Sequence, residues 1–391
     1  MRGLIHLQSI IGWTVCIQVL FWVLFIPYAV AIPFDVSLGL TEHGIQANHS
    51  SLPLEHLFKR ASGYSSLTFA SNCDEAQQNY VKAELDEVQT MLTRAKAGLS
   101  TIRSVLMDKE QPEDWGTRYS EYSRLLNTWQ NYFGRIELNR GVAKAPMQGS
   151  LVTFTQAASN MQNLISIYDS ISRALSQSTL NALLNCNDAF FEWQDPGEGA
   201  DPNADRVYVD TRERGQATIP VTLTSTGRLC HESDSAHGWT FRNQVTGRDE
   251  ICICPATFTR TNTANKLSQY PNDPETLKGK SLNDLKFNAA AGTLLHELTH
   301  CQHILEAAKT DDKVYNDGKT KKAAYRIGGV RALAFYNPGE TMKNADTLAY
   351  FALAMYYSQC DWSFGICGEA KDPYTRKDET TGKVAYMKFE Y

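Results

Sequence analysis

The sequence predicts a mainly α-helical α+β protein, with a long helical region first and a small twisted sheet later. Three observations support this fold class. Apolar residues recur at helical spacing through residues 74–184, short β-prone segments separated by turn residues follow, and further helical segments come last. The chain has 391 residues, 42% of them hydrophobic, which is enough for one large core or two smaller ones.

Residues 1–31 have the pattern of a signal peptide. Arg2 and His6 precede an apolar stretch over residues 10–30, and an Ala-Val-Ala tripeptide ending at Ala31 has the spacing that signal peptidase reads. The stretch is also long enough for a membrane anchor. No basic stop-transfer cluster follows it, so we expect cleavage after Ala31 and a secreted protein without stable membrane association.

Residues 32–60 are expected to be a pro-segment. They contain a glycosylation sequon at Asn48 and end in the dibasic pair Lys59-Arg60. Such a pair is usually a solvated charge pair. Here it lies between the signal peptide and the first cysteine that follows, which favours a processing site.

Residues 61–185 are predicted to form a helical region. Apolar residues recur there at three- and four-residue steps, for example Val81, Leu85, Val88 and Leu92, and residues 119–136 and 154–184 repeat the pattern. We expect an antiparallel bundle in which aromatic side chains such as Trp129 and Tyr132 form the core rather than a binding platform.

Residues 186–370 are predicted to form the second unit. Short β-prone segments lie at 207–209, 217–223 and 250–255, and a long loop at 261–280 leads into a helix that Ser281 or Asn283 can cap. A second helical run covers residues 342–358. Residues 371–391 are charged and are expected to be a loose tail.

Cysteine usage points to disulfide bonds. Nine cysteines are present and Cys16 leaves with the signal peptide, so eight remain, an even number that implies disulfides in a secreted chain. Cys252 and Cys254 would share one face of a strand, so we expect each to pair elsewhere. Soft metal ligation is the alternative, which an extracellular location disfavours.

The motif His296-Glu297-Leu298-Thr299-His300 carries the clearest chemical signal. Its preceding residues favour helix, and residues four apart on a helix share a face, so both imidazoles can bind one ion. Glu297 would then lie beside the open metal position. Two neutral histidines, a metal-bound water and a carboxylate that takes its proton form the layout of a zinc hydrolase. We therefore expect one zinc ion per chain.

The charge pattern excludes one class of partner. The formal net charge is -5, and no basic run interleaves with aromatic residues, so a nucleic-acid partner is not expected. Protein or peptide substrates and a monomeric chain are expected instead.

A catalytic zinc site needs a third protein ligand. No third histidine occurs at the metzincin spacing, and His303, three residues past His300, is turned away from the face of the pair. Carboxylates follow the helix at Asp311 and Asp312, and again at Asp346.

Here the chain resembles the aspzincin metallopeptidases, the fungal deuterolysins and lysine-specific metalloendopeptidases. The resemblance rests on the H-E-L-T-H helix, the upstream segment 251–258, the N-A-D-x-x-x-Y-F-A run beginning at Asn344, and the layout of signal and dibasic pro-segment. It covers most of residues 70–360. It implies a zincin-like catalytic unit and peptide-bond hydrolysis.

The resemblance implies that the third ligand is an aspartate in a G-T-x-D-x-x-Y-G segment. Residues 310–315 keep T-x-D-x-x-Y, whereas residues 319–325 fit the downstream spacing better but place Lys322 at the aspartate position. A protonated lysine has no lone pair to offer. We therefore expect Asp312 to be the ligand, with an insertion after Tyr315 and with Asp311 as the reserve; a solvated acidic turn is the alternative.

Two further roles follow from the resemblance. Tyr325 or Tyr315 is expected to donate its hydroxyl to the oxyanion of the tetrahedral intermediate, and the alternative between them stays open. Asp346 matches an acidic residue near the S1′ substrate pocket, or else caps a helix or supports a ligand. The second acid of the lysine-specific members is replaced by Ala349, so strict lysine specificity is not expected.

The sequence thus predicts a secreted zinc endopeptidase made as a precursor. His296, His300 and Asp312 would bind zinc, and Glu297 would be the general base. One alternative is a non-catalytic secreted protein on a degenerate aspzincin scaffold. Another is a membrane-anchored binding protein with structural zinc, which the open fourth position disfavours.

Overall fold

The computed structural model describes residues 68–107, 115–136, 151–177, 180–194, 206–212, 218–221, 230, 236–243, 245–260, 266–368, 375–377 and 384–386. The predicted signal peptide and pro-segment, with the sequon and the dibasic pair, lie outside these residues, as does most of the predicted tail. All described residues belong to the compact unit formed by residues 60–391. Among the described helices, none is long and apolar enough to cross a membrane.

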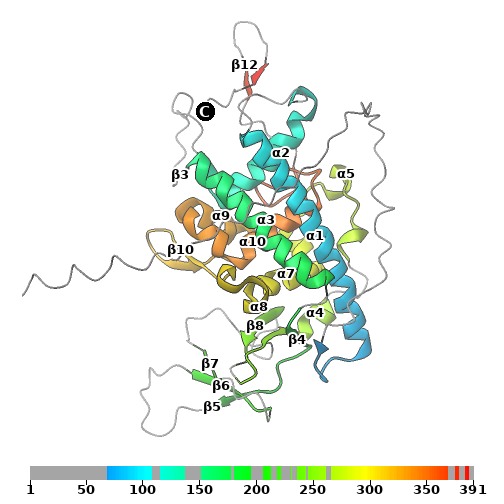
Figure 1. The fold of residues 1–391 in the computed structure, drawn as a ribbon. Helices are drawn as coiled ribbons and strands as arrows, with labels where there is room; N and C mark the ends of the chain where they lie inside the picture. Colours follow the sequence, from blue (N-terminus) through cyan, green and yellow to red (C-terminus); the bar gives the residue numbers. More distant parts are fainter. Residues whose placement is uncertain are drawn as a thin grey trace, which may run out of the picture. The chain divides into compact units, whose positions relative to one another are not determined.

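Helices dominate the fold (Figure 1), which confirms the predicted mainly α-helical α+β class. The α-helices are α1 (Glu75–Met107), α2 (Trp115–Phe133), α3 (Phe154–Ser176), α4 (Pro255–Arg260), α5 (Pro274–Leu277), α6 (Leu282–Asn288), α7 (Ala291–His300), α8 (Gln302–Leu305), α9 (Arg326–Tyr336) and α10 (Ala345–Tyr356). Short 3₁₀ helices are η3 (Leu267–Gln269), η4 (Glu306–Ala308) and η5 (Pro338–Lys343).

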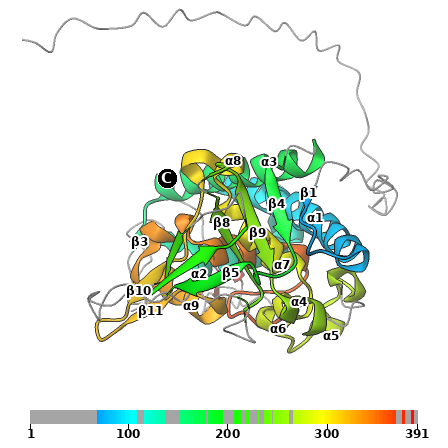
Figure 2. The same ribbon diagram turned by 90° about the horizontal axis from the view of Figure 1, so that it is seen from below.

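The strands form one small sheet and several strand pairs. They are β1 (Thr68–Phe69), β2 (Arg135–Ile136), β3 (Leu151–Val152), β4 (Ala182–Asn185), β5 (Phe191–Gln194), β6 (Arg206–Asp210), β7 (Thr218–Val221), β8 (Gly238–Arg242), β9 (Asp249–Ile253), β10 (Val314–Asn316), β11 (Lys321–Ala323), β12 (Thr375–Lys377) and β13 (Val384–Tyr386). The main sheet has the order β1-β4-β9-β8, and Figure 2 shows its strands side by side. β8 runs antiparallel to β9, whereas the other pairs are parallel.

The main sheet packs on the helices through alternating side chains. Ile251 and Ile253 of β9 belong to the principal core, whereas Cys252 between them joins Phe191 and Phe241 in a second cluster. This is the two-residue period of a strand buried on both faces. The sheet therefore separates two apolar layers, and α7 packs beside β8.

One continuous core joins the two predicted regions. α1 contacts α2 and α3 from the helical region, and also α7 and α10 from the second unit. Every residue of α10 is buried, and apart from Asp346 and Thr347 in its first turn the helix is mainly apolar on all sides. The helical region and the second unit thus share one core, and the longest helix, α1, packs against α7.

Two sequence-based expectations about local structure were wrong, and one strand of the main sheet was missed. Residues 182–185, predicted as helix, form β4, because a short apolar run fits a buried strand as well as a helix. Ser281 caps α6 and not the helix of the His-Glu motif. β8 was not predicted at all; its sequence, Gly-Trp-Thr-Phe-Arg, has only a weak alternating pattern.

Disulfides form as predicted for six cysteines. The bonds are Cys73–Cys186, Cys230–Cys254 and Cys360–Cys367. Cys252 and Cys301 were also each expected to form a disulfide bond. That expectation was wrong, since both are buried free thiols. An even count of cysteines says nothing about which faces they occupy. Here Cys301 lies in the principal core and Cys252 in the second cluster, on the other face of the sheet.

Candidate metal centre

α7 holds the two histidines of the motif side by side. The Nε2 atoms of His296 and His300 lie 3.2 Å apart, as four-residue spacing on a helix predicts. Nearly the whole helix is buried, because its apolar residues pack in the core. The ligand atoms of His296, Glu297 and His300 lie within 4.8 Å of one another.

Asp312 completes this cluster from a separate segment. Its Oδ1 lies 3.3 Å from Nε2 of His296 and 3.6 Å from Nε2 of His300. A tetrahedral zinc ion with bonds of about 2.0–2.2 Å holds its ligand atoms roughly 3.3–3.6 Å apart. The three separations fit this spacing, so a nitrogen, nitrogen and oxygen donor set that suits zinc converges on one point.

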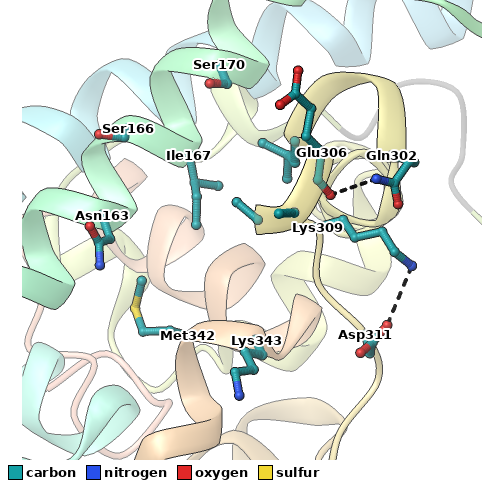
Figure 3. Close-up of a pocket in the computed structure, with 13 residues that line it drawn as sticks. Asn163, Ser166, Ile167, Ser170, Gln302, Glu306, Lys309, Asp311, Met342 and Lys343 are labelled. Carbon is teal, nitrogen blue, oxygen red and sulfur yellow. Dashed lines mark hydrogen bonds and ion pairs between the residues drawn. The ribbon is translucent and has the colours of Figure 1, made fainter. Parts of the chain in front are cut away.

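Asp311 faces the opposite way. Its carboxylate is 61% exposed and is paired with Lys313 at 3.1 Å and Lys309 at 3.9 Å. Figure 3 shows it lining a separate cleft of about 620 Å³ between α3 and η5. Successive residues of an extended segment point to opposite sides. The structure therefore places Asp312 next to the two histidines, and not Asp311, which was the alternative candidate for the third ligand.

Asn344 anchors the segment that carries Asp312. Its backbone pairs with Asp311, and its side-chain oxygen accepts from the backbone N–H of Lys313 at 3.0 Å. Its Nδ2 donates to the carbonyl of Ala324 at 3.2 Å. Asn344 thus holds the residues on both sides of Asp312 through its backbone and its side chain. The same side chain connects them to Ala324, which precedes Tyr325.

The hairpin of β10 and β11 separates Asp312 from Tyr325. Tyr325 forms a side-chain hydrogen bond with Asp312, and its ring centroid lies 6.2 Å from that of His296. Tyr315 instead stacks on Tyr336 at 5.9 Å. Lys322, on β11, is paired with Asp317 at 2.7 Å and is half exposed. Of the two tyrosines predicted for the site, the structure brings only Tyr325 to it, because the hairpin carries Tyr315 away.

Asp346 lies behind His296 and not in an open pocket. Its Oδ1 is 2.8 Å from Nδ1 of His296 and is also hydrogen-bonded to the ammonium of Lys286. Its Oδ2 accepts from the backbone N–H of Arg326 at 2.7 Å. The side chain is buried and both oxygens are engaged, contacts that suit the supporting role given as the alternative to the S1′ pocket.

The charges of these groups are strongly coupled. Burial lowers the pKa of His296, but the carboxylates of Asp312 and Asp346 outweigh burial and raise that pKa to about 10. Burial also raises the pKa of Asp312, yet His296 and His300 hold it well below its usual range. These carboxylates thus favour the doubly protonated, positively charged form of His296. A zinc ligand is a neutral imidazole, so zinc binding would release the second proton.

His303 is not part of the cluster. Its backbone N–H donates to Asp249 at 2.8 Å, and its Nδ1 lies 3.2 Å from the same carboxylate. Asp249 begins β9, so this contact joins α8, the short helix that follows α7, to the sheet. The structure agrees with the expectation that His303 is turned away from His296 and His300.

A buried carboxylate caps the first residue of α7. Oε2 of Glu84 accepts from the backbone N–H of Ala291 at 2.8 Å, while its Oε1 has no hydrogen-bond partner among the described residues. Burial, and then the charge of Glu87, raise the pKa of Glu84 from 4.5 to about 7, although the bond from Ala291 lowers it. The helix that carries His296 and His300 thus begins on a carboxylate of α1.

We expect Glu84→Gln to stabilise the protein above pH 7. The folded-state pKa of Glu84 is raised, so its contribution to stability is fully present below pH 4.5 and is lost as pH rises through 7. Each pKa unit corresponds to about 1.4 kcal/mol. The amide keeps the acceptor for Ala291, so the free energy of unfolding at pH 8 should rise by about 1–3 kcal/mol and change little at pH 4.5.

Urea unfolding at the two pH values measures this difference. Glu75→Gln, an exposed change on the same helix, is the matched control and should leave the pH dependence unaltered. A Glu84→Gln protein that is less stable than the parent at pH 8 would show that the charged carboxylate is favoured at the start of α7.

Three residues near the cluster were not predicted by the sequence. They are Thr240, which donates to Glu297, Lys286, which neutralises Asp346, and the hydrogen-bonding side chain of Asn344. Asn344 belongs to the N-A-D run on which the aspzincin resemblance partly rests, but the sequence analysis assigned no structural role to its side chain. For Thr240 and Lys286 the sequence holds no signal, because their partners lie 57 and 60 residues away.

Comparisons with known proteins add little. No family model matches the chain, and no curated protein matches its sequence. Among solved structures, a zinc peptidase from Grifola frondosa matches with 14% identity over 72% of this chain and 97% of that chain, at a TM-score of 0.31.

Proposed function

We propose that this protein is a zinc-dependent endopeptidase. The observation that carries the proposal is the convergence of His296, His300 and Asp312 at separations that fit one tetrahedral zinc ion, with Glu297 beside them. Structural zinc is usually closed by four protein ligands, whereas three ligands and an adjacent carboxylate are typical of hydrolytic sites. This donor set therefore supports hydrolysis over a structural role.

Each residue has a distinct task in this proposal. His296, His300 and Asp312 would hold the metal, which supplies a Lewis acid for the scissile carbonyl and lowers the pKa of water. Glu297 accepts the proton of the attacking water and passes it to the leaving amine. Tyr325, whose side chain is hydrogen-bonded to Asp312, would give up that bond and donate its hydroxyl hydrogen to the developing oxyanion. Asp346 accepts the Nδ1 hydrogen of His296, which turns the Nε2 lone pair toward the centre.

The surroundings of Asp346 bear on specificity. The resemblance to the lysine-specific peptidases implies that the Asp346 carboxylate would attract a lysine side chain of the substrate. Here Lys286 is already bonded to it, and the ammonium also lies 4.8 Å from the centroid of the Tyr350 ring. Little negative charge remains for a substrate, so the proposed peptidase is not a lysine-specific one.

Zinc removal and restoration test the proposed function. The purified chain should contain one zinc ion and cleave casein, should lose cleavage with 1,10-phenanthroline, and should regain it with added zinc. A zinc-loaded chain that cleaves neither casein nor a random peptide library would favour the non-catalytic alternative. A chain that binds no zinc would overturn the metal centre itself.

The proposed enzyme is secreted as a precursor. Three disulfides support an oxidising location, and the pattern of residues 1–60 supports removal of a signal peptide and a pro-segment. We expect the mature chain to start at Ala61, after Lys59-Arg60. N-terminal sequencing of the secreted protein checks this, and a chain that begins at Ile32 would contradict the pro-segment.

A further inference from the structure

The two oxygens of the Glu297 carboxylate have different surroundings. Oε1 lies 4.0 Å from Nε2 of His296, on the side of the metal cluster. Oε2 accepts a hydrogen bond from Oγ1 of Thr240 at 2.8 Å. Glu297 is only 3% exposed, so bulk water does not compete freely for that second oxygen. One oxygen therefore faces the reaction site while the other is tied to the sheet.

The sheet dictates where the Thr240 hydroxyl lies. Trp239 and Phe241, on either side of Thr240, stack on each other and pack in the second apolar cluster. Side chains alternate along a strand, so Gly238 and Thr240 face α7. β8 is aligned with β9 through the pairing of Thr240 with Ile251, a fully buried residue. The hydroxyl thus projects from a strand in fixed register.

β8 also approaches the helix closely at this point. A Cβ added to Gly238 would lie 3.3 Å from Cγ2 of Thr293 and 3.4 Å from Cγ of Glu297. The Thr240 hydroxyl also lies 3.2 Å from the backbone carbonyl of Glu297. A hydroxyl has one hydrogen to donate, and the shorter contact is to the carboxylate. Little space remains for Glu297 to adopt another orientation on this side.

We propose that Thr240 is a positioning residue for Glu297. Its hydroxyl holds Oε2, so that Oε1 stays beside the space enclosed by His296, His300 and Asp312. This inference rests on the proposed function, because it assigns Thr240 a part in the same hydrolytic step. Displacing a reacting group by about 1 Å costs on the order of 10²-fold in rate. Loss of the hydroxyl should therefore lower kcat rather than substrate binding.

Three substitutions separate the hydroxyl from the packing at this position. Thr240→Val keeps the branched shape without the hydroxyl, Thr240→Ala removes the hydroxyl without adding bulk, and Thr240→Ser keeps the hydroxyl. Thr341→Val is the control, since Thr341 also donates its hydroxyl to an internal oxygen, the carbonyl of Pro338, away from Glu297; Thr341 is fully buried and Thr240 is half-buried.

We expect Thr240→Val and Thr240→Ala to lower kcat by about 10–100-fold, with KM within about threefold of the parent and one zinc ion per chain. Thr240→Ser and Thr341→Val should stay within about threefold of the parent kcat. An unchanged kcat in both Thr240→Val and Thr240→Ala would overturn the proposal. So would a Thr240→Ser enzyme as impaired as the other two, because packing would then be responsible.

Crystal structures of the zinc-loaded parent and Thr240→Ala proteins provide a readout independent of activity. Glu297 should turn away from the histidines in the variant, and an unmoved carboxylate would contradict the proposal. If the zinc-loaded parent cleaves no peptide, the proposed function fails. The orientation of Glu297 in the two structures still decides whether Thr240 positions it.

Discussion

Glu297→Gln is expected to abolish peptide hydrolysis and leave zinc in place. The amide has the size of the carboxylate and still accepts a hydrogen bond from Thr240, but it cannot take a proton from water. Loss of general base catalysis alone lowers kcat by about 10²–10⁴. Casein cleavage and metal content of the purified variant measure the two effects separately.

Glu340→Gln is a suitable control for this experiment. Glu340 is partly exposed and is paired with Lys343 and Lys313 at the surface, without contact to Glu297, so its neutralisation should leave both activity and metal content unchanged. A Glu297→Gln protein with activity within tenfold of the parent would rule out Glu297 as the base. A variant that lost its zinc would instead indicate that Glu297 is needed to hold the metal.

The second large effect is expected at the third ligand. Asp312→Ala should strip zinc and activity together, because only His296 and His300 would remain and catalytic zinc sites keep three protein ligands. Asp311→Ala is the matched control. It removes the same side chain one residue earlier, from a position exposed to solvent and turned toward Lys313, and should retain metal and activity.

Asp346→Ala distinguishes a ligand from a residue that supports one. Its carboxylate contacts Nδ1 of His296, so its loss should weaken zinc affinity by about 10–100-fold and still allow full loading in excess zinc. Metal analysis of the three variants after dialysis decides between the assignments. Full loading of Asp312→Ala beside an empty Asp346→Ala would mean that α10 supplies the third ligand.

Local spacing explains which parts of the site could be predicted. His296, Glu297 and His300 lie on one helix, and a helix places residues four apart together wherever it packs. The heptad-like pattern of α1 likewise predicted a helix correctly, since one apolar face repeats for many turns. β4 was misassigned because three apolar residues and an asparagine carry no period long enough to separate strand from helix.

Adjacent residues were harder to tell apart. Asp311 and Asp312 are chemically identical, and only the parallel bridge between Asp311 and Asn344 sets which of them faces the histidines. The same holds for Tyr315 and Tyr325, which the sequence offered as equals. The intervening hairpin turns Tyr315 toward Tyr336 and leaves Tyr325 bonded to Asp312.

By itself, the sequence determined the mainly helical α+β class and the His296-Glu297-His300 face, because both follow from periodicities within single elements. Only the tertiary structure decided that Asp312 and Tyr325 meet that face, that Lys286 neutralises Asp346, and that Thr240 holds Glu297. Those contacts join segments far apart in the chain. Their geometry depends on strand register and helix packing, which are properties of the whole core and not of any local run of residues.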